Sequence, residues 1–190
     1  MAFYRQYKDL FPFSKDLLFQ YFHNFEESML IVAVRKFSES SYKRSRNPVK
    51  IYPADTGLCR RVASEDAGRI LETIVFIELA RRGGEVFYFE EKQECDFVVK
   101  DGEGTRFAAF QVCRELTDEN RLREIGGLTA ACRHLDLSEG MILTDNQDGE
   151  ENVEGIKISV RPVWRWLLAD PDSWTPTPAQ MPLTLSLIHI

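Results

Sequence analysis

The stretch ECDFVVKDGEGTRFAAFQVC, residues 94–113, decides the fold of this chain. Two runs rich in β-branched and aromatic residues flank Asp101–Gly104, whose aspartate and glycines favour a turn between strands. The pattern predicts a β-hairpin with Asp96 on the first strand. Gln111 and Cys113 end the second strand, and because side chains alternate along a strand, these two share one face.

Apolar periodicity predicts the elements on either side of this hairpin. Before it come a helix over 67–82, ended by two glycines, and a strand over 85–89. After it come a helix over 118–135, strands over 141–144 and 156–160, and a closing helix over 163–168. The order from residue 67 is therefore α-β-β-β-α-β with a further strand and helix. We predict an α/β fold, a mixed sheet flanked by helices.

The N-terminal part predicts an appendage to that fold. Ser14 is a plausible N-cap for a helix over 14–27, and strands over 29–37 and 49–52 suggest a β-hairpin. We divide the chain into residues 1–50, a helix and hairpin linker resembling the remnant of a winged-helix connector, and residues 51–170, the main domain. Residues 175–190 are expected to be a disordered or artefactual tail, because 185–190 resemble a translated sequencing adapter. The aromatic start, without a leader, indicates a fragment.

Composition bounds the function. The net charge of −6 and pI near 5.2 argue against a uniformly basic nucleic-acid coat. Four separated cysteines, without a C-x-x-C pair, disfavour zinc and a disulfide framework. Since no apolar run approaches the length of a membrane span, a cytoplasmic protein without membrane contact is expected. A phosphate-binding G-x-x-x-x-G-K-[ST] motif is missing from the sequence, so we expect no ATP site of that type in this chain.

Three acids or their replacements resemble the site of PD-(D/E)XK nucleases, which carry an acid on a helix, an aspartate on one strand and an acid-x-lysine triplet on the next. Glu72 and Asp96 match the first two positions, and Gln111-Val112-Cys113 stands where the triplet belongs. The resemblance makes Glu72, Asp96, Gln111 and Cys113 degenerate catalytic positions. Mg²⁺ prefers hard oxygen ligands, so Asp96, Glu72 and Gln111 are weak metal candidates, and no other cofactor is expected. Taken alone, Asp96 is better interpreted as a strand aspartate bonded to nearby backbone or to an arginine, because a single acid is weak evidence of a site.

Two groups of cations bear on this site. Lys100 lies on the strand of Asp96, four residues away, and alternation predicts a shared face, but its place near the turn argues against rescue of the missing lysine. The basic cluster Lys43, Arg44, Arg46 and Lys50 is a candidate contact for nucleic acid or a partner. A solvated loop is the more ordinary interpretation of that cluster.

A wider set of motifs resembles the C-terminal domain of unknown function of prokaryotic AAA-type ATPases. The motifs are PVKIYPADTGL (48–58), GRILETIVFIEL (68–79), ECDFVV (94–99), FQVC (110–113) and VWRWLL (163–168), and the resemblance extends over about 13–168. It implies a PD-(D/E)XK-like fold and a preceding ATPase module in the full-length protein.

Three functions follow as hypotheses. The first is a noncatalytic nuclease-fold module that binds DNA or a protein partner, favoured by the missing lysine and the acidic balance. The second is a Mg²⁺-dependent DNA nuclease with an altered site, favoured by the spacing of the acids. The third is a structural domain that self-associates and sets the oligomeric state of the ATPase through apolar residues in 3–25.

Overall fold

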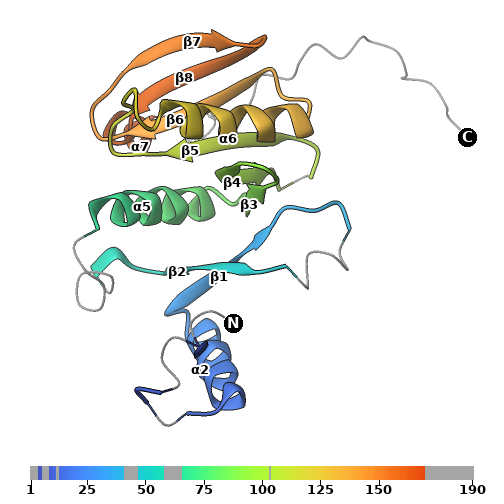
Figure 1. Cartoon of the computed structure of the whole chain (residues 1–190), viewed down its shortest axis with the longest axis vertical. Coiled ribbons are helices and arrows are strands. Elements are labelled where there is room, and N and C mark those ends of the chain that lie inside the picture. The colour runs from blue at the N-terminus through green and yellow to red at the C-terminus, as the bar shows by residue number, and fades with distance from the viewer. Residues whose placement is uncertain are drawn as a thin grey trace, which may run out of the picture.

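A computed structural model describes residues 4–5, 9–11, 13–40, 47–57, 66–102 and 104–169. One eight-stranded sheet runs through it in the order β2-β1-β3-β4-β5-β6-β8-β7 (Figure 1). The strands are β1 (Ile31–Lys36), β2 (Val49–Pro53), β3 (Glu85–Glu90), β4 (Glu94–Lys100), β5 (Phe107–Val112), β6 (Glu139–Thr144), β7 (Gly149–Val153) and β8 (Ile156–Pro162). The helices are α2 (Lys15–Glu27), α5 (Ala67–Arg81), α6 (Arg121–His134) and α7 (Val163–Leu168).

The predicted α/β class and the central order α5-β3-β4-β5-α6-β6 are confirmed. Strands β3, β4 and β5 form an antiparallel meander, and β6 lies parallel to β5 because α6 carries the chain back across the sheet. The sheet is therefore mixed, as the sequence predicts, and the turn at 101–104 closes the expected hairpin between β4 and β5.

Helices cover both faces of the sheet, and the sheet divides the core into two clusters. On one face α5 and α7 bury Val75, Phe76, Leu79 and Trp166 against the sheet. On the other, α6 buries a second cluster that includes Leu128 and Cys132. Phe97 and Phe110 belong to the first cluster, and Val98 and Ala109 belong to the second, as strand alternation requires.

Two sequence predictions are wrong in detail. Strand β7 was missed because its sequence, GEENV, is polar and acidic; it forms as the antiparallel edge partner of β8 across a turn at Glu154 and Gly155, both at positive φ. Leu122 was assigned to the apolar face of α6, but it is 84% exposed. The helix starts only at Arg121, and small residues such as Gly127 and Ala131 occupy its buried face.

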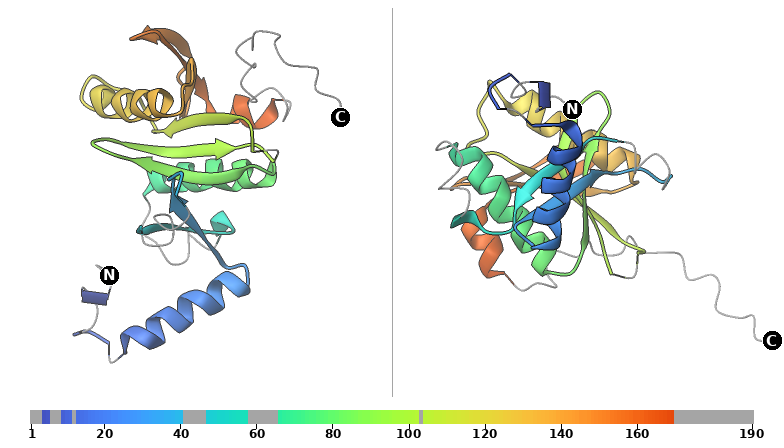
Figure 2. Two further views of the ribbon diagram at one scale, coloured as in Figure 1. Left: turned by 90° about the vertical axis from the view of Figure 1, so that its right-hand side faces the viewer. Right: turned by 90° about the horizontal axis from the view of Figure 1, so that it is seen from below.

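The N-terminal elements extend the main sheet. Strand β1 pairs antiparallel with β2 and parallel with β3, so the expected boundary between residues 50 and 51 falls inside β2. Helix α2 begins at the predicted cap, where the Ser14 side chain accepts a hydrogen bond from Leu17 N, and it lies at the opposite end of the molecule from β7 (Figure 2). Lys43, Arg44, Arg46 and the predicted tail fall outside the described residues. None of the helices in the described part of the chain is long and apolar enough to cross a bilayer.

Candidate functional site

A β-bulge at the start of β4 aims Asp96. Phe89 pairs with Cys95 and Phe87 with Val98, so Asp96 and Phe97 together oppose a single residue of β3. Alternation is broken there, and Asp96 turns to the face that carries α5. Its Oδ2 accepts a hydrogen bond from Val112 N at 2.9 Å, which fixes the carboxylate against β5.

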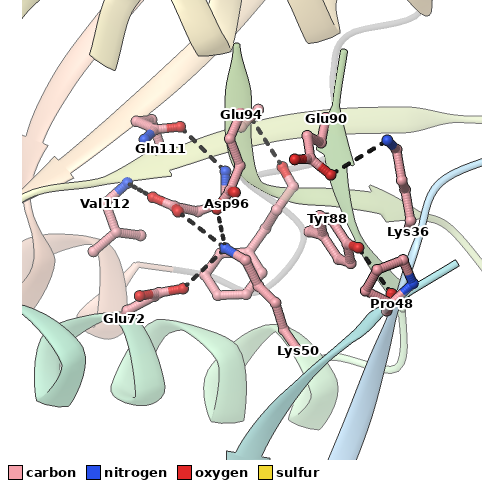
Figure 3. Close-up of polar contacts among 12 residues, drawn as sticks. Lys36, Pro48, Lys50, Glu72, Tyr88, Glu90, Glu94, Asp96, Gln111 and Val112 are labelled. Atoms are coloured by element: carbon pink, nitrogen blue, oxygen red, sulfur yellow. Dashed lines mark hydrogen bonds and ion pairs between the residues drawn. The ribbon is translucent and has the colours of Figure 1, made fainter. Parts of the chain in front are cut away.

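The ammonium of Lys50 lies among three carboxylates (Figure 3). Lys50 Nζ is 3.5 Å from Glu72 Oε1 and 3.5 Å from Asp96 Oδ1, and it also bonds Glu94. Because Lys50 pairs with the core residue Val34, its side chain leaves β2 on the face covered by α5. The prediction that Lys50 contacts nucleic acid or a partner stays a prediction, and in the structure its ammonium contacts carboxylates of this chain.

Tyr52 completes this cluster. It is two residues from Lys50 on the same face of β2, and its hydroxyl donates to Glu72 Oε1 at 2.5 Å. Its ring stacks on Phe76 with centroids 4.6 Å apart, so the hydroxyl is held by the apolar core. Burial and the nearby charge of Glu72 raise the pKa of Tyr52, which keeps the hydroxyl a donor.

The charges in the cluster are not balanced. Burial raises the pKa of Asp96 to about 7; repulsion from Glu72 adds to the rise, and Lys50 partly offsets it. Burial disfavours the charge on Lys50, but its bond to Glu94 and the attraction of Asp96 and Glu72 raise its pKa overall. Three acids therefore share one permanent cation, and the cluster tends to keep a proton near neutral pH.

Gln111 turns to the other face. Its Oε1 accepts from Asp96 N at 3.1 Å, and its Nε2 donates to Glu124 Oε2 at 2.6 Å. Glu124 is only 2% exposed and is also bonded by the Arg123 guanidinium. Gln111 stands where the nuclease pattern has an acid, and its neutral amide connects β5 to a carboxylate of α6.

Helix α6 packs so closely that it positions Glu94. A Cβ on Gly127 would lie 1.9 Å from the backbone oxygen of Glu94, whereas a Cβ on Gly126 would meet only the flexible end of Gln93. The absence of a side chain at Gly127 lets the helix rest on the first residue of β4. The glycine pair was not assigned this role from sequence.

A cleft of about 750 Å³ opens beside the cluster. It is lined by six acids, Asp66, Glu72, Glu94, Asp96, Glu115 and Glu124, by four bases, Arg69, Lys92, Arg114 and Arg123, and by Gln111 and Cys113 among others. Burial and the charge of Glu124 raise the pKa of Cys113 to about 12, so this thiol is neutral. It supplies no cation to the cleft.

The arrangement does not fit a Mg²⁺ ion. Glu72 and Asp96 lie close together as predicted, but both contact the Lys50 ammonium. The carbonyl oxygen of Gln111 already accepts a hydrogen bond from Asp96 N. Among the described residues no three acidic, histidine or cysteine side chains are placed to hold a metal. Mg²⁺ requires oxygens at about 2.0–2.1 Å in near-octahedral geometry.

Sequence reasoning placed Glu72 and Asp96 together, singled out Lys50 for another role, and assigned no role to Tyr52 or Glu94. Lys100 was predicted to share a face with Asp96, but the bulge separates them, and its ammonium lies near Gly104 at the turn. Glu94 was read only as part of the strand, and Glu124 only as part of the helix. The basic cluster and the resemblance motif around Lys50 were the two signals in the sequence that pointed to β2.

Comparison with known proteins places the chain in a larger context. It is 32% identical over 167 residues to the uncharacterized protein MJ1544 of Methanocaldococcus jannaschii. The match covers 82% of this chain but 37% of that protein, so the chain spans well under half the length of this relative. No protein-family model matches the chain. No solved structure matches it either.

Proposed function

We propose that the chain is a noncatalytic nuclease-fold module, belonging to an ATP-binding protein of the AAA type, that binds a partner at the cleft. The observation that carries the proposal is the Lys50 ammonium among Glu72, Glu94 and Asp96. A tethered cation takes the central place that a nuclease site of this kind needs for its metal. Such a site retains a shape and a charge pattern but not the means to activate water.

The other two substitutions support the absence of catalysis. The carbonyl oxygen of Gln111 is already engaged with Asp96 N, and Cys113 holds a neutral thiol in the position of the lysine. Loss of one electrostatic contact to a developing charge typically costs about 10²–10³ in rate. Here the metal ligand and the cation of the triplet are both replaced.

Charge favours a protein partner over nucleic acid. The cleft is lined by six acids and four bases, and the whole chain carries −6. A phosphate backbone needs an excess of lysine and arginine along its path. The residues Lys43, Arg44 and Arg46, which would argue for DNA, are not among those described.

The context of the proposal is a longer protein. MJ1544 extends well beyond the matched region, which leaves room for the ATPase module that the motifs imply. We place the protein in the cytoplasm, because the described cysteines are free and two of them, Cys95 and Cys132, are buried in the core.

A cleavage assay tests the absence of catalysis. Purified chain is incubated with linear and supercoiled DNA in Mg²⁺ or Mn²⁺ beside an Asp96→Ala control. We expect equal background in both. Metal-dependent cutting by the wild type that disappears in the control would refute the proposal. Fluorescence anisotropy with labelled duplex and single-stranded DNA, at stated salt, tests the preference for protein; binding tighter than micromolar at physiological salt would contradict it.

A second candidate function, an altered Mg²⁺-dependent DNA nuclease, is favoured by the same Lys50. Its ammonium lies 3.5 Å from Asp96 and supplies, from β2, the positive charge that Cys113 lacks. This candidate predicts cutting that is lost in both Asp96→Ala and Lys50→Met. It also predicts no gain from Cys113→Lys, whereas recovery of activity in Cys113→Lys alone would mean that the triplet lysine was the missing group.

The third candidate, an oligomerisation domain, is favoured by α2. This helix buries none of its residues, and Phe19, Tyr21 and Phe25 are exposed. Sedimentation velocity over a range of concentrations tests it. A dimer that dissociates in Phe19→Gln and Phe25→Gln would support this function, and a monomer at all concentrations would remove it.

A further inference from the structure

Strands β1 and β2 are attached to the rest of the sheet over a short length. Only Arg35 and Lys36 of β1 pair with β3, at Phe87 and Tyr88, with one more backbone bond from Phe37 N to Tyr88 O at 2.7 Å. By contrast, β6 pairs with β8 from Glu139 to Thr144. Strand β2 lies at the edge of the sheet, and within the described part of the chain its backbone pairs with β1 alone.

Side chains, rather than a backbone ladder, hold β2 against the core. Lys50 reaches the three carboxylates, and its ammonium lies 5.5 Å from the centre of the Tyr88 ring. Tyr52 donates to Glu72, and Tyr88 Oη donates to Pro48 O at 2.8 Å. The side chains of Tyr52 and Val34 are also buried. Detachment of strands β1 and β2 from the sheet therefore costs free energy, and the detached form is a minor state.

The carboxylates beneath β2 favour release once their cation is removed. Glu94 is half-exposed to the cleft, and Asp96 is mostly buried. Without Lys50, three acids would face one another without their shared cation, and Asp96, the most buried of the three, would gain hydration if β2 moved away. Because burial already holds the Asp96 pKa near 7, the cluster lacks positive charge even when Lys50 is present.

We propose that the β1–β2 pair is a strap pinned by Lys50, and that a cationic side chain of a protein partner entering the cleft competes for Glu94 and releases it. In the resting protein the strap holds Lys50 against the carboxylates, and it moves away when a lysine or arginine of the partner takes the place of Lys50. The nature of the occupant rests on the proposed function, a cleft that binds protein. The pinning does not, because it concerns contacts within this chain alone.

Hydrogen exchange of the full chain, followed by mass spectrometry, tests the pinning. Lys50→Met should raise exchange about tenfold or more in peptides over 31–36 and 49–53, while β4, β5 and α6 keep their rates. Lys36→Met is the matched control, since Lys36 lies on the same strand pair and its ammonium bonds a single acid among the described residues, Glu90, at 3.3 Å. It should change exchange by about twofold or less. Equal acceleration of strap and core, or none in the strap, would overturn the proposal.

A gentler variant covers the case in which Lys50→Met does not fold. Glu94→Gln removes one partner of Lys50 at a half-exposed position, so the fold should survive. It should accelerate exchange in the strap several-fold and leave α6 unchanged. Lys50→Arg retains the cation and should stay close to wild type. Unchanged strap exchange in Glu94→Gln refutes the pinning.

Three added cations separate the triggers. A tetralysine peptide should speed strap exchange in the wild type beyond the effect of NaCl at the same ionic strength, and it should add little in Lys50→Met. If NaCl acts equally, screening alone opens the strap and competition by a basic side chain is wrong. If Mg²⁺ at that ionic strength acts more strongly than both, the carboxylates take a metal, and this trigger is wrong. Failure of the function alone, seen as DNA cleavage, would leave the pinning result intact.

Discussion

Helix α5 presents two glutamates to two very different surroundings. Glu78 is bonded by Arg81 and Arg82, with N–O distances of 2.7 Å, and the side chain of Arg82 is 1% exposed. Arg82 also donates to Trp166 O, and its guanidinium lies 4.4 Å from the centre of the Trp166 ring. Glu72, by contrast, shares the single ammonium of Lys50 with two further acids.

The difference distinguishes charged groups that stabilise the fold, around Glu78, from charged groups at a candidate site, around Glu72. At Glu78 two cations meet one acid, the bond to Arg81 lowers the carboxyl pKa, and the network ties α5 to α7. At Glu72 one cation meets three acids, burial raises the Asp96 pKa to about 7, and a cleft opens beside them. Groups held in an unfavourable state at a cleft are the usual mark of a functional site.

The largest expected effect is on the balanced cluster. Glu78→Ala leaves the buried Arg82 without its partner, and we expect a loss of about 3–5 kcal/mol in the free energy of unfolding. The pKa of Glu78 is lowered, so the stability it contributes is present above its unfolded pKa and is lost as pH falls through the folded value. Urea titration at pH 7 checks the magnitude. A loss below 1 kcal/mol would show that the network is not structural.

Next comes the contact that positions Glu94. Gly127→Ala forces a methyl group against a backbone oxygen, so α6 must shift; we expect a loss of about 2–3 kcal/mol despite the better helix propensity of alanine. Gly126→Ala is the matched control, because only the end of Gln93 must move, and it should be neutral or slightly stabilising. The same urea titration decides, and equal effects at both glycines would contradict this packing.

A smaller effect of opposite sign is expected in the unbalanced cluster. The folded pKa of Asp96 is raised to about 7, so its contribution to stability is present below its unfolded pKa, near 4, and is lost as pH rises through 7. Asp96→Asn keeps an acceptor for Val112 N and removes the charge. It should therefore be more stable than wild type at pH 8 by about 1–3 kcal/mol and equal to it near pH 4. Thermal unfolding between pH 4 and 8 measures this difference. A variant that is less stable than wild type at pH 8 would show that the Asp96 charge does not destabilise the folded protein.

The smallest effect is expected at Glu72 itself. Glu72→Gln keeps an oxygen that accepts from the Tyr52 hydroxyl and removes one of three negative charges. The free energy of unfolding should therefore change by about 1 kcal/mol or less. The sharper readout is the Asp96 pKa, which should fall because repulsion from Glu72 is gone. Carboxyl ¹³C titration by NMR follows it. A pKa that stays at about 7 would assign the whole shift to burial.

Local pattern determined much of the molecule from its sequence. Apolar periodicity gave the order of helices and strands from residue 67, and Asp101 with the nearby glycines gave the central hairpin. Residue identity at two positions was also informative. Gln111 and Cys113 cannot supply the carboxylate and the ammonium of the nuclease triplet, whatever the fold of the chain. Apolar periodicity did not predict strand β7, because an edge strand exposed to water needs no apolar face.

Tertiary structure alone decided which charges meet. Lys50 and Asp96 are 46 positions apart, and their contact depends on β1 carrying β2 beside the main sheet. The bulge that turns Asp96 toward α5 depends on how β4 registers with β3. Glu124 reaches Gln111 because α6 packs across the sheet, and Gly127 lets that helix lie close to the start of β4. Periodicity reports which face a residue occupies within its own element. Periodicity does not predict which other element will cover that face, because the packing partner is fixed only when the strands pair and the layers pack.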